Sequence, residues 1–475
     1  MNYERKYDVF IVHRLQFIVK INMKIHLIAV GGAVMHNMAL ALKHNGHEVT
    51  GSDDEIYEPS RSRLAAAGLL PQETGWHPER ITKDLDAVIL GMHARPDNPE
   101  LKKARDLGIS IYSFPEFIYE KSKDKTRIVV AGSHGKTSTT AMIMHVLRFA
   151  DVKFDYLVGA QLEGFERMVQ LSDAPYIIIE GDEYLSSPID RRPKFVHYHP
   201  HIAVLTGIAW DHMNVFPTFE NYVSQFELLL NAFEENGTLF FYQKDENIRQ
   251  LLKNAAHSIN AIPYDKFDFE IKNNTTRIKR WGRGNVPLKI FGEHNLSNLL
   301  AAFKVCREIG VSESDFFEAV ESFDGAAKRL DLLYENDKFA AWKDFAHAPS
   351  KVRATVSAVK AQYPNRRLVA MLELHTFSSL NKAFLPEYSE TLNAADIAGV
   401  YFNEHTLKMK KLPPITPDDI RGHFNFPDLK VFTCEKALKA FLKNQKWENA
   451  NLLMMSSGTF GGLDLAGLTK YLSEK

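Results

Sequence analysis

The stretch IVVAGSHGKTS, residues 128–138, decides the fold of this chain. Its first four residues form an apolar run that predicts a buried β-strand, and residues 137–149 predict a helix. The loop between them contains two glycines, so its backbone amides and the N-terminus of the helix converge on one point. Such a turn is typical of a phosphate site. The stretch therefore predicts an α/β unit that holds a nucleotide.

Two side chains of this loop indicate which nucleotide chemistry to expect. Lys136 places a mobile positive charge at the β- and γ-phosphates, and the Thr137 hydroxyl completes the ligand shell of Mg²⁺. The full P-loop pattern has a glycine where this chain has Val130, so the loop is a shortened version, and a glycine turn with a chance lysine is the alternative. The predicted contacts of ATP are Gly132, Ser133, His134, Gly135, Lys136, Thr137 and Ser138.

Acidic residues follow the apolar strand predicted for residues 176–180. Glu180, Asp182 and Glu183 stand at its carboxyl end, the edge of a parallel sheet at which ligands bind. Mg²⁺ paired with ATP prefers carboxylate oxygen, so these side chains are candidate metal and substrate ligands. A solvated acidic loop is the alternative.

Two further groups of polar residues follow the same logic. Asp211 and His212 come after an apolar strand at residues 202–206, and His212 could bind a second metal or an acidic substrate, although a lone histidine is more often structural. Another predicted helix begins with residues that either cap its N-terminus or form hydrogen bonds to the edge of an adenine base. These residues are His294, Asn295 and Asn298.

A βαβ pattern precedes the nucleotide loop. Residues 25–51 read as strand, helix and strand, with Gly31 and Gly32 after the first strand. Asp53 stands where a dinucleotide fold has the acid that holds a ribose. Other glycines of that pattern are missing, so this region predicts a nucleotide ligand without specifying NAD.

The length of 475 residues exceeds what one hydrophobic core usually serves. We predict three domains, near residues 23–122, 123–324 and 325–475. The predicted fold class is α/β, with a Rossmann-like N-terminal domain, a central P-loop ATP-binding domain and a C-terminal Rossmann-like domain. Residues 1–22 carry short apolar runs broken by charges, without a signal-peptide pattern, and are interpreted as an extension outside the fold.

Composition limits the possible partners. The formal net charge is -1, from 58 basic and 59 acidic side chains, so no global field favours nucleic acid or an anionic membrane. The two cysteines, Cys306 and Cys434, have no metal-type spacing and cannot build a disulfide framework, which suits a reducing compartment. We therefore expect a cytoplasmic protein that recognises its partners locally, as a monomer or a dimer.

Taken together, these motifs resemble those of the Mur ligases, which build the peptide stem of bacterial peptidoglycan. The resemblance runs from about residue 25 to residue 463, and several motifs in the right order are far more specific than any one. The matching stretches are Gly31-Gly32-Ala33, Gly132 to Thr140, Glu180-Gly181-Asp182-Glu183, Asp211-His212-Met213, Gly292-Glu293-His294-Asn295, Lys328-Arg329 and Asp344-Phe345-Ala346-His347-Ala348-Pro349.

The resemblance implies a role for each matching residue. Lys136 and Thr137 would bind the ATP phosphates and Mg²⁺, Glu180 the same metal, and His212 a second metal and the substrate acyl group. The residues implied at adenine, or closing on ATP from the third domain, are His294, Asn295, Asn298, Arg329 and Asp344, with Arg329 counted among the catalytic residues beside Lys136, Glu180 and His212. The implied contacts of the UDP-sugar or the acceptor are Gly31, Gly32, Asp53, Glu183, His347, His375 and Ser379.

The resemblance also implies the reaction. Such ligases phosphorylate a carboxylate with ATP, and an amine attacks the acyl phosphate to give an amide. Here the carboxylate would belong to UDP-N-acetylmuramate, and the acceptor would be either L-alanine or the tripeptide L-Ala-γ-D-Glu-meso-diaminopimelate. A non-catalytic UDP-sugar-binding protein is a remoter alternative, and a P-loop kinase or GTPase leaves the first and third domains unexplained.

Local stretches point to different acceptors. Residues 182–184 and 192–198 resemble the branch of the family that uses the tripeptide, and residues 374–378 resemble the branch that uses L-alanine. Ser379 stands where the alanine branch has an arginine, so L-alanine would lose a bidentate clamp on its carboxylate. The tripeptide is the favoured acceptor, and the candidate partners for its carboxylates are Lys351, Arg353 and Lys382.

Overall fold

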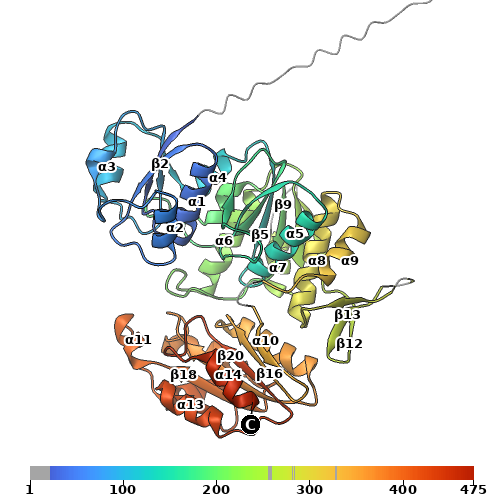
Figure 1. The fold of residues 1–475 in the computed structure, drawn as a ribbon. Helices are drawn as coiled ribbons and strands as arrows, with labels where there is room; N and C mark the ends of the chain where they lie inside the picture. The colour runs from blue at the N-terminus through green and yellow to red at the C-terminus, as the bar shows by residue number, and fades with distance from the viewer. Residues whose placement is uncertain (1–21, 255–258, 281, 283, 327–328, 475) are drawn as a thin grey trace, which may run out of the picture.

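The computed structural model describes residues 22–254, 259–280, 282, 284–326 and 329–474 of the chain (Figure 1). Nearly all of the proposed extension, and Lys328 of the Lys328-Arg329 motif, lie outside the described residues. The described strands form two large sheets and two smaller ones, flanked by helices. The expected α/β fold class is confirmed.

The first unit, residues 24–120, is a four-stranded parallel sheet in the order β2-β1-β3-β4. The apolar strand β1 is central because it pairs with β2 on one side and β3 on the other. Ile25 of β1 lies opposite Val49 of β2 and Ala87 of β3. The bounds are β1 (Lys24–Ile28), α1 (Ala33–His44), β2 (Glu48–Ser52), α2 (Ser60–Ala66), η1 (Pro78–Arg80), β3 (Ala87–Leu90), α3 (Pro99–Asp106), β4 (Ile111–Ser113) and α4 (Phe114–Glu120).

The central unit, residues 126–321, is a seven-stranded sheet in the order β11-β10-β9-β5-β8-β6-β7, parallel except for β7. The strand that opens the nucleotide loop, β5, lies in the middle between β8 and β9. The bounds are β5 (Thr126–Ala131), α5 (Lys136–Phe149), β6 (Phe154–Leu157), β7 (Val169–Gln170), β8 (Tyr176–Gly181), η2 (Lys194–Tyr198), β9 (Ile202–Leu205), α6 (Phe219–Asn231), β10 (Thr238–Tyr242), α7 (Glu246–Asn254), β11 (Asn260–Tyr264), α8 (Glu293–Glu308) and α9 (Glu313–Glu321).

A small antiparallel sheet, β12-β13-β14, interrupts this unit between β11 and α8 and projects from its lower right in Figure 1. Its strands are β12 (Phe269–Lys272), β13 (Thr275–Ile278) and β14 (Val286–Leu288). The sequence did not predict it, because short half-exposed strands carry a weak periodic signal.

The third unit, residues 331–473, is a six-stranded sheet in the order β15-β16-β20-β17-β18-β19, with only β15 antiparallel. Apolar clusters cover both of its faces. The bounds are β15 (Asp331–Glu335), β16 (Phe339–Asp344), α10 (Pro349–Gln362), β17 (Arg367–Leu374), η3 (Lys382–Tyr388), β18 (Ile397–Phe402), α11 (Glu404–Met409), α12 (Pro417–Phe424), β19 (Lys430–Phe432), α13 (Glu435–Lys443), β20 (Ala450–Met455) and α14 (Leu465–Ser473).

The first two units share one apolar core. Phe117 of α4 and Phe195 of η2 belong to the same buried cluster as β1 and β9. Each such buried phenylalanine contributes about 1.5–3 kcal/mol from burial alone. The predicted boundaries at 122/123 and 324/325 fall in the connections between units. None of the described helices combines the length and the apolar character needed to cross a membrane.

Sheet register brings the predicted site residues to one edge. Val130 of β5 lies opposite Glu180 of β8, and Ala131 lies opposite Leu205 of β9. The nucleotide loop, Glu180 and the segment after β9 therefore emerge together at the carboxyl edge of the central sheet. In Figure 1 the third unit lies below the central one, across this edge.

Candidate active site

A cavity of about 680 Å³ lies between the central and third units. Its lining includes residues 133–138, the start of α8 and the segment around His212, and from the third unit residues 344–347 and 375–378. Most of the predicted ATP and metal residues thus face one space, although they come from positions more than two hundred residues apart.

The backbone of the loop explains its two glycines. Gly132 and Gly135 have φ values of +127° and +79°, in the left-handed region that favours glycine. A Cβ atom at Gly135 would lie 2.5 Å from Oδ1 of Asn298, and one at Gly132 would overlap Thr206. Any larger residue would displace the loop from the strand edge, so its shape depends on both glycines.

Lys136 is held inside the protein by its own carboxylate partner. Its Nζ donates to the Gly132 carbonyl at 2.7 Å and to Oε2 of the fully buried Glu183 at 2.8 Å. Burial favours a lower pKa for Lys136, but the charges of Glu183 and Asp182 outweigh it and raise that pKa. The lysine is therefore a permanent cation at the loop.

Glu183 is the centre of a buried network rather than part of the described cavity lining. Burial acts to raise the pKa of its carboxyl, yet Lys136 and His212 hold that pKa well below its usual range. The Tyr222 hydroxyl lies 3.1 Å from Oε1 of Glu183 and 2.8 Å from Oγ of Ser133. Glu183 is thus placed to position Lys136 and the loop, not to contact a substrate directly.

Thr137 and Glu180 form an oxygen pair that fits Mg²⁺. The Thr137 hydroxyl donates to Oε1 of Glu180 at 2.7 Å, and the Gly159 amide donates to Oε2 at 2.9 Å. Burial, with the nearby charge of Asp182, raises the pKa of Glu180. A buried carboxylate of this kind gains from a cation, and an alcohol beside a carboxylate is a suitable pair of hard ligands.

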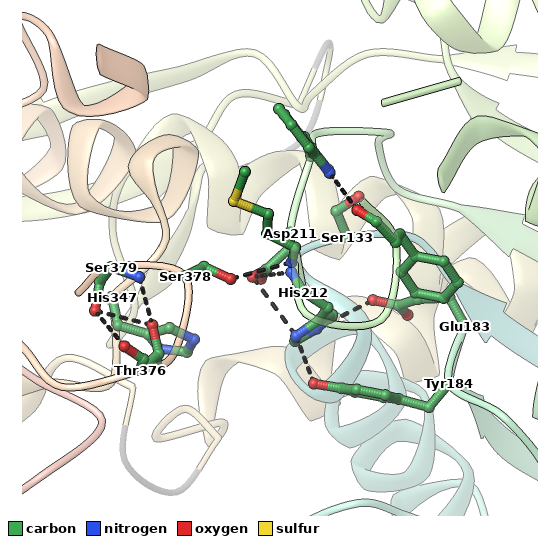
Figure 2. Close-up of polar contacts among 12 residues, drawn as sticks. Ser133, Glu183, Tyr184, Asp211, His212, His347, Thr376, Ser378 and Ser379 are labelled. Carbon is green, nitrogen blue, oxygen red and sulfur yellow. Dashed lines mark hydrogen bonds and ion pairs between the residues drawn. The ribbon is translucent and has the colours of Figure 1, made fainter. Parts of the chain in front are cut away.

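His212 has partners on both ring nitrogens, as Figure 2 shows. Its Nδ1 lies 2.5 Å from the Tyr184 hydroxyl, and its Nε2 lies 3.4 Å from Oε1 of Glu183. Burial, with the charge of Asp211, raises the pKa of Tyr184, so the phenol stays protonated and donates a hydrogen bond to Nδ1. His212 can ligate a metal only by exchanging one of these contacts, and that role stays a prediction.

Two polar contacts join the segment around His212 to the third unit, beside the edge-to-face packing of Trp210 on Phe384. The Met213 amide donates to Oγ of Ser378 at 3.1 Å, and Nζ of Lys351 lies 3.3 Å from Oδ2 of Asp211. Burial lowers the pKa of Lys351, with Asp211 opposing that effect and Lys136 adding to it. The sequence named Lys351 only as a possible carboxylate partner. Its pairing with an aspartate 140 positions away could not be read from local pattern.

The residues expected at adenine also reach the cavity. His294, Asn295 and Asn298 line it from the first turns of α8. Burial and the charge of Arg329 lower the pKa of His294 to about 4, which leaves a neutral ring at physiological pH. Arg329 itself lies over the Phe345 ring, 5.0 Å from its centroid. The Asp344 carboxylate accepts the Leu330 amide at 2.7 Å, and both Arg329 and Asp344 line the cavity.

Five predicted substrate residues, Glu183 among them, lie outside the described lining. In the first unit Asp53 accepts the Gly31 amide at 2.7 Å, and Gly32 precedes α1. Burial raises the pKa of Asp53 to about 6. In the third unit Ser379 is fully buried, with Oγ 2.9 Å from Oγ1 of Thr376 (Figure 2). The other two predicted residues of the third unit, His347 and His375, do line the cavity.

Two of the three proposed carboxylate partners are engaged elsewhere. Lys382 pairs with Asp419 at 2.6 Å, and Arg353 donates to the Ser389 carbonyl at 3.0 Å. The described lining contains Lys351 but neither of these two. It also contains Tyr184 and Lys410, which the sequence analysis did not assign to the site. Tyr184 could have been found from its place directly after Glu183.

His347 makes stability depend on pH. Burial and the charge of Lys351 lower its pKa to about 4, whereas an unfolded histidine titrates near 6.5. Its contribution to stability is therefore complete above about pH 6.5 and is lost as pH falls toward 4, by on the order of 1 kcal/mol per pH unit.

We expect Tm to fall between about pH 7 and pH 5, with a shallower fall in His347→Gln. His405→Gln, at an exposed position of α11, is the matched control, and equal slopes in all three proteins would contradict the prediction.

Comparison with known proteins gives two family matches. The family model described as Mur ligase middle domain matches residues 130–306, and the model described as Mur ligase family, catalytic domain matches residues 24–126. A UDP-N-acetylmuramate–L-alanyl-γ-D-glutamyl-meso-2,6-diaminoheptandioate ligase of Escherichia coli (strain K12) is 30% identical over 74% of this chain and 79% of its own length.

Two other proteins are also similar to this chain. A UDP-N-acetylmuramate–L-alanine ligase of Ligilactobacillus salivarius (strain UCC118) is 31% identical over 78% of this chain and 81% of its own. The crystal structure of a murein peptide ligase from Psychrobacter arcticus has a TM-score of 0.63 and 23% identity, with 95% of this chain and 99% of that one covered. Because the first two identities are nearly equal, overall identity does not distinguish the acceptors.

Proposed function

Because this chain belongs to the Mur ligase family, and is therefore an ATP-dependent, ADP-forming ligase, we propose that it joins L-Ala-γ-D-Glu-meso-diaminopimelate to UDP-N-acetylmuramate. The reaction would take place in the cytoplasm with Mg²⁺ bound at Thr137 and Glu180. The cavity contains the nucleotide loop at one side and third-unit side chains at the other, which suits a nucleotide and a peptide bound together.

In the first step the muramate carboxylate would attack the γ-phosphorus of ATP, forming an acyl phosphate and releasing ADP. Lys136, fixed by Glu183, lies where it can neutralise charge on the transferring phosphoryl group. A Mg²⁺ ion held by Thr137 and Glu180 would supply further neutralisation of phosphoryl charge. The loop amides and Lys136 would thus stabilise the charge on the phosphoryl group in the transition state more than they stabilise ATP before transfer.

In the second step the amine of the acceptor would attack the acyl carbon, phosphate would leave, and the amine would lose a proton. Water competes with the amine for the acyl phosphate. Two polar contacts beside His212, Met213 to Ser378 and Lys351 to Asp211, hold the third unit against the central one there and would limit that competition.

The choice of the tripeptide depends on one observation, the burial of Ser379. At this position the alanine branch of the family is expected to place an arginine, and here a serine is fully buried against Thr376. A short acceptor such as L-alanine therefore lacks that guanidinium beside its carboxylate. The resemblance of residues 374–378 to the alanine branch, with His375 in the cavity lining, favours L-alanine as the second candidate.

We expect a clear preference for the tripeptide in steady-state ADP release at fixed ATP and UDP-N-acetylmuramate. A missing charge-assisted pair changes affinity by about tenfold or more, so kcat/KM for the tripeptide should exceed that for L-alanine by at least that factor. Equal values, or a higher value for L-alanine, would assign the chain to the alanine branch.

A further inference from the structure

The cationic side chains of the cavity differ in whether they have a partner. Lys136 pairs with Glu183, Lys351 with Asp211 and Lys266 with Glu293. Lys410 also lines the cavity, yet within the described residues its ammonium group has neither an ion pair nor a hydrogen bond. Its charge is therefore available to an anionic group of a ligand.

The local geometry selects Lys410 from three lysines close in sequence. Lys408 lies in the last turn of α11, and Lys410 and Lys411 follow that helix. Lys410 is half-buried, whereas Lys408 and Lys411 are exposed and absent from the described lining. A half-buried ammonium without a counter-charge is less favourable than an exposed one, so a bound carboxylate would stabilise it more.

Lys410 and the adenine residues enter the cavity from different units. In Figure 1, α11 stands at the left edge of the third unit, while α8, which carries His294 and Asn295, lies at the right of the central unit. In the proposed reaction the loop amides and Lys136 of the central unit hold the phosphates of the nucleotide. Lys410 of the third unit is then left for an anionic group of the acceptor.

The chemistry of the proposed acceptor matches this position. The tripeptide reacts through its L-alanine amine and carries three free carboxylates, one on the γ-linked glutamate and two on diaminopimelate. An extended peptide spans about 3.3–3.6 Å per residue, so the diaminopimelate carboxylates trail roughly 7–10 Å behind the amine. The single carboxylate of L-alanine is adjacent to its amine and cannot reach as far.

We propose that Lys410 binds a diaminopimelate carboxylate of the peptide acceptor and so determines acceptor length. This inference rests on the proposed function and adds a specificity residue to it. Lys410 contacts the substrate away from the reacting atoms, so it is expected to affect acceptor binding and not the phosphorylation of the muramate carboxylate.

The test compares Lys410→Ala and Lys410→Arg with Lys408→Ala and Lys411→Ala in the full chain. Each protein is assayed for ADP release with the tripeptide, the dipeptide L-Ala-γ-D-Glu, and L-alanine. We expect Lys410→Ala to lower kcat/KM for the tripeptide about tenfold or more, mainly through KM, and to leave the dipeptide value unchanged. Lys410→Arg should retain most of the activity, and the two control variants should stay within about twofold of the wild type.

The outcomes separate the two proposals. A wild-type preference for the tripeptide that Lys410→Ala leaves intact would overturn the role of Lys410 alone. An equal loss with the dipeptide would do the same, because it would show a general defect. A wild-type preference for L-alanine would overturn the proposed function, and with it the inference. Matching thermal melting curves show that the variants are folded.

Discussion

Replacing Lys136 with alanine is expected to reduce ADP release by at least about 10²–10³-fold, the usual effect of removing one group that stabilises transition-state charge. The side chain contributes a charge at the loop and little apolar packing. The measurement is kcat for ADP release at saturating ATP, UDP-N-acetylmuramate and tripeptide. A folded Lys136→Ala protein with near-normal turnover would refute the assignment of the loop.

The structure adds a stability effect to this substitution. Lys136→Ala leaves the fully buried Glu183 without its cation, and breaking a buried pair in this way costs about 3–5 kcal/mol. The double variant Lys136→Ala/Glu183→Gln removes both charges and should recover much of the lost Tm while remaining inactive. If activity returned together with Tm, the loss in the single variant would be a folding defect and not a catalytic one.

Replacing Glu180 with glutamine is expected to lower kcat/KM about a hundredfold and to shift the Mg²⁺ titration midpoint to higher concentration. The amide is nearly the same size, but it is a poorer Mg²⁺ ligand than a carboxylate. The Glu180 carboxylate accepts hydrogen bonds from the Thr137 hydroxyl and the Gly159 amide. In the glutamine variant, the side-chain NH₂ group would face one of these two donors. The readout is ADP release as a function of Mg²⁺ concentration.

Asp182→Asn is the matched control for Glu180→Gln. Asp182 lines the same cavity but pairs with Lys194 at 3.1 Å and makes no contact with the Thr137 hydroxyl. It should change the Mg²⁺ midpoint much less. An unchanged midpoint in Glu180→Gln, or ligation without a divalent metal, would contradict the assignment of Glu180 to the metal.

The nucleotide loop could be predicted from sequence because its determinants are local. The strand, Gly132, Gly135 and the start of α5 lie within eleven residues, and the carboxyl-edge rule then places Glu180 nearby. What the sequence missed depends on packing between distant segments. The burial of Ser379 follows from its packing on Thr376 within the third unit, and the pairing of Lys351 with Asp211 from how that unit meets the central one. Among the described residues, the lack of a partner for the Lys410 ammonium is likewise a property of the folded chain and not of local sequence.

The first unit shows the same limit in another way. Gly31 and Asp53, which the sequence placed in one nucleotide-binding pattern, lie side by side, since the Asp53 carboxylate accepts the Gly31 amide. Yet Gly31 and Asp53 do not belong to the described lining of the main cavity. A local sequence pattern does not predict the distance between a loop of one unit and a cavity formed by other units. Their role in holding the UDP-sugar stays a prediction.

The contacts of the His212 segment with the third unit also bear on the rate at which the acyl intermediate would be lost to hydrolysis. If the third unit swings away, the Met213 amide loses its acceptor on Ser378 and Asp211 loses Lys351, both in a single movement. In the proposed reaction, the same movement would expose the acyl phosphate to bulk water and remove the third-unit side of the cavity, which would present the amine. Assembly of the reacting centre and binding of the acceptor would then occur together, and loss of the intermediate to hydrolysis would depend on how long the two units remain in contact.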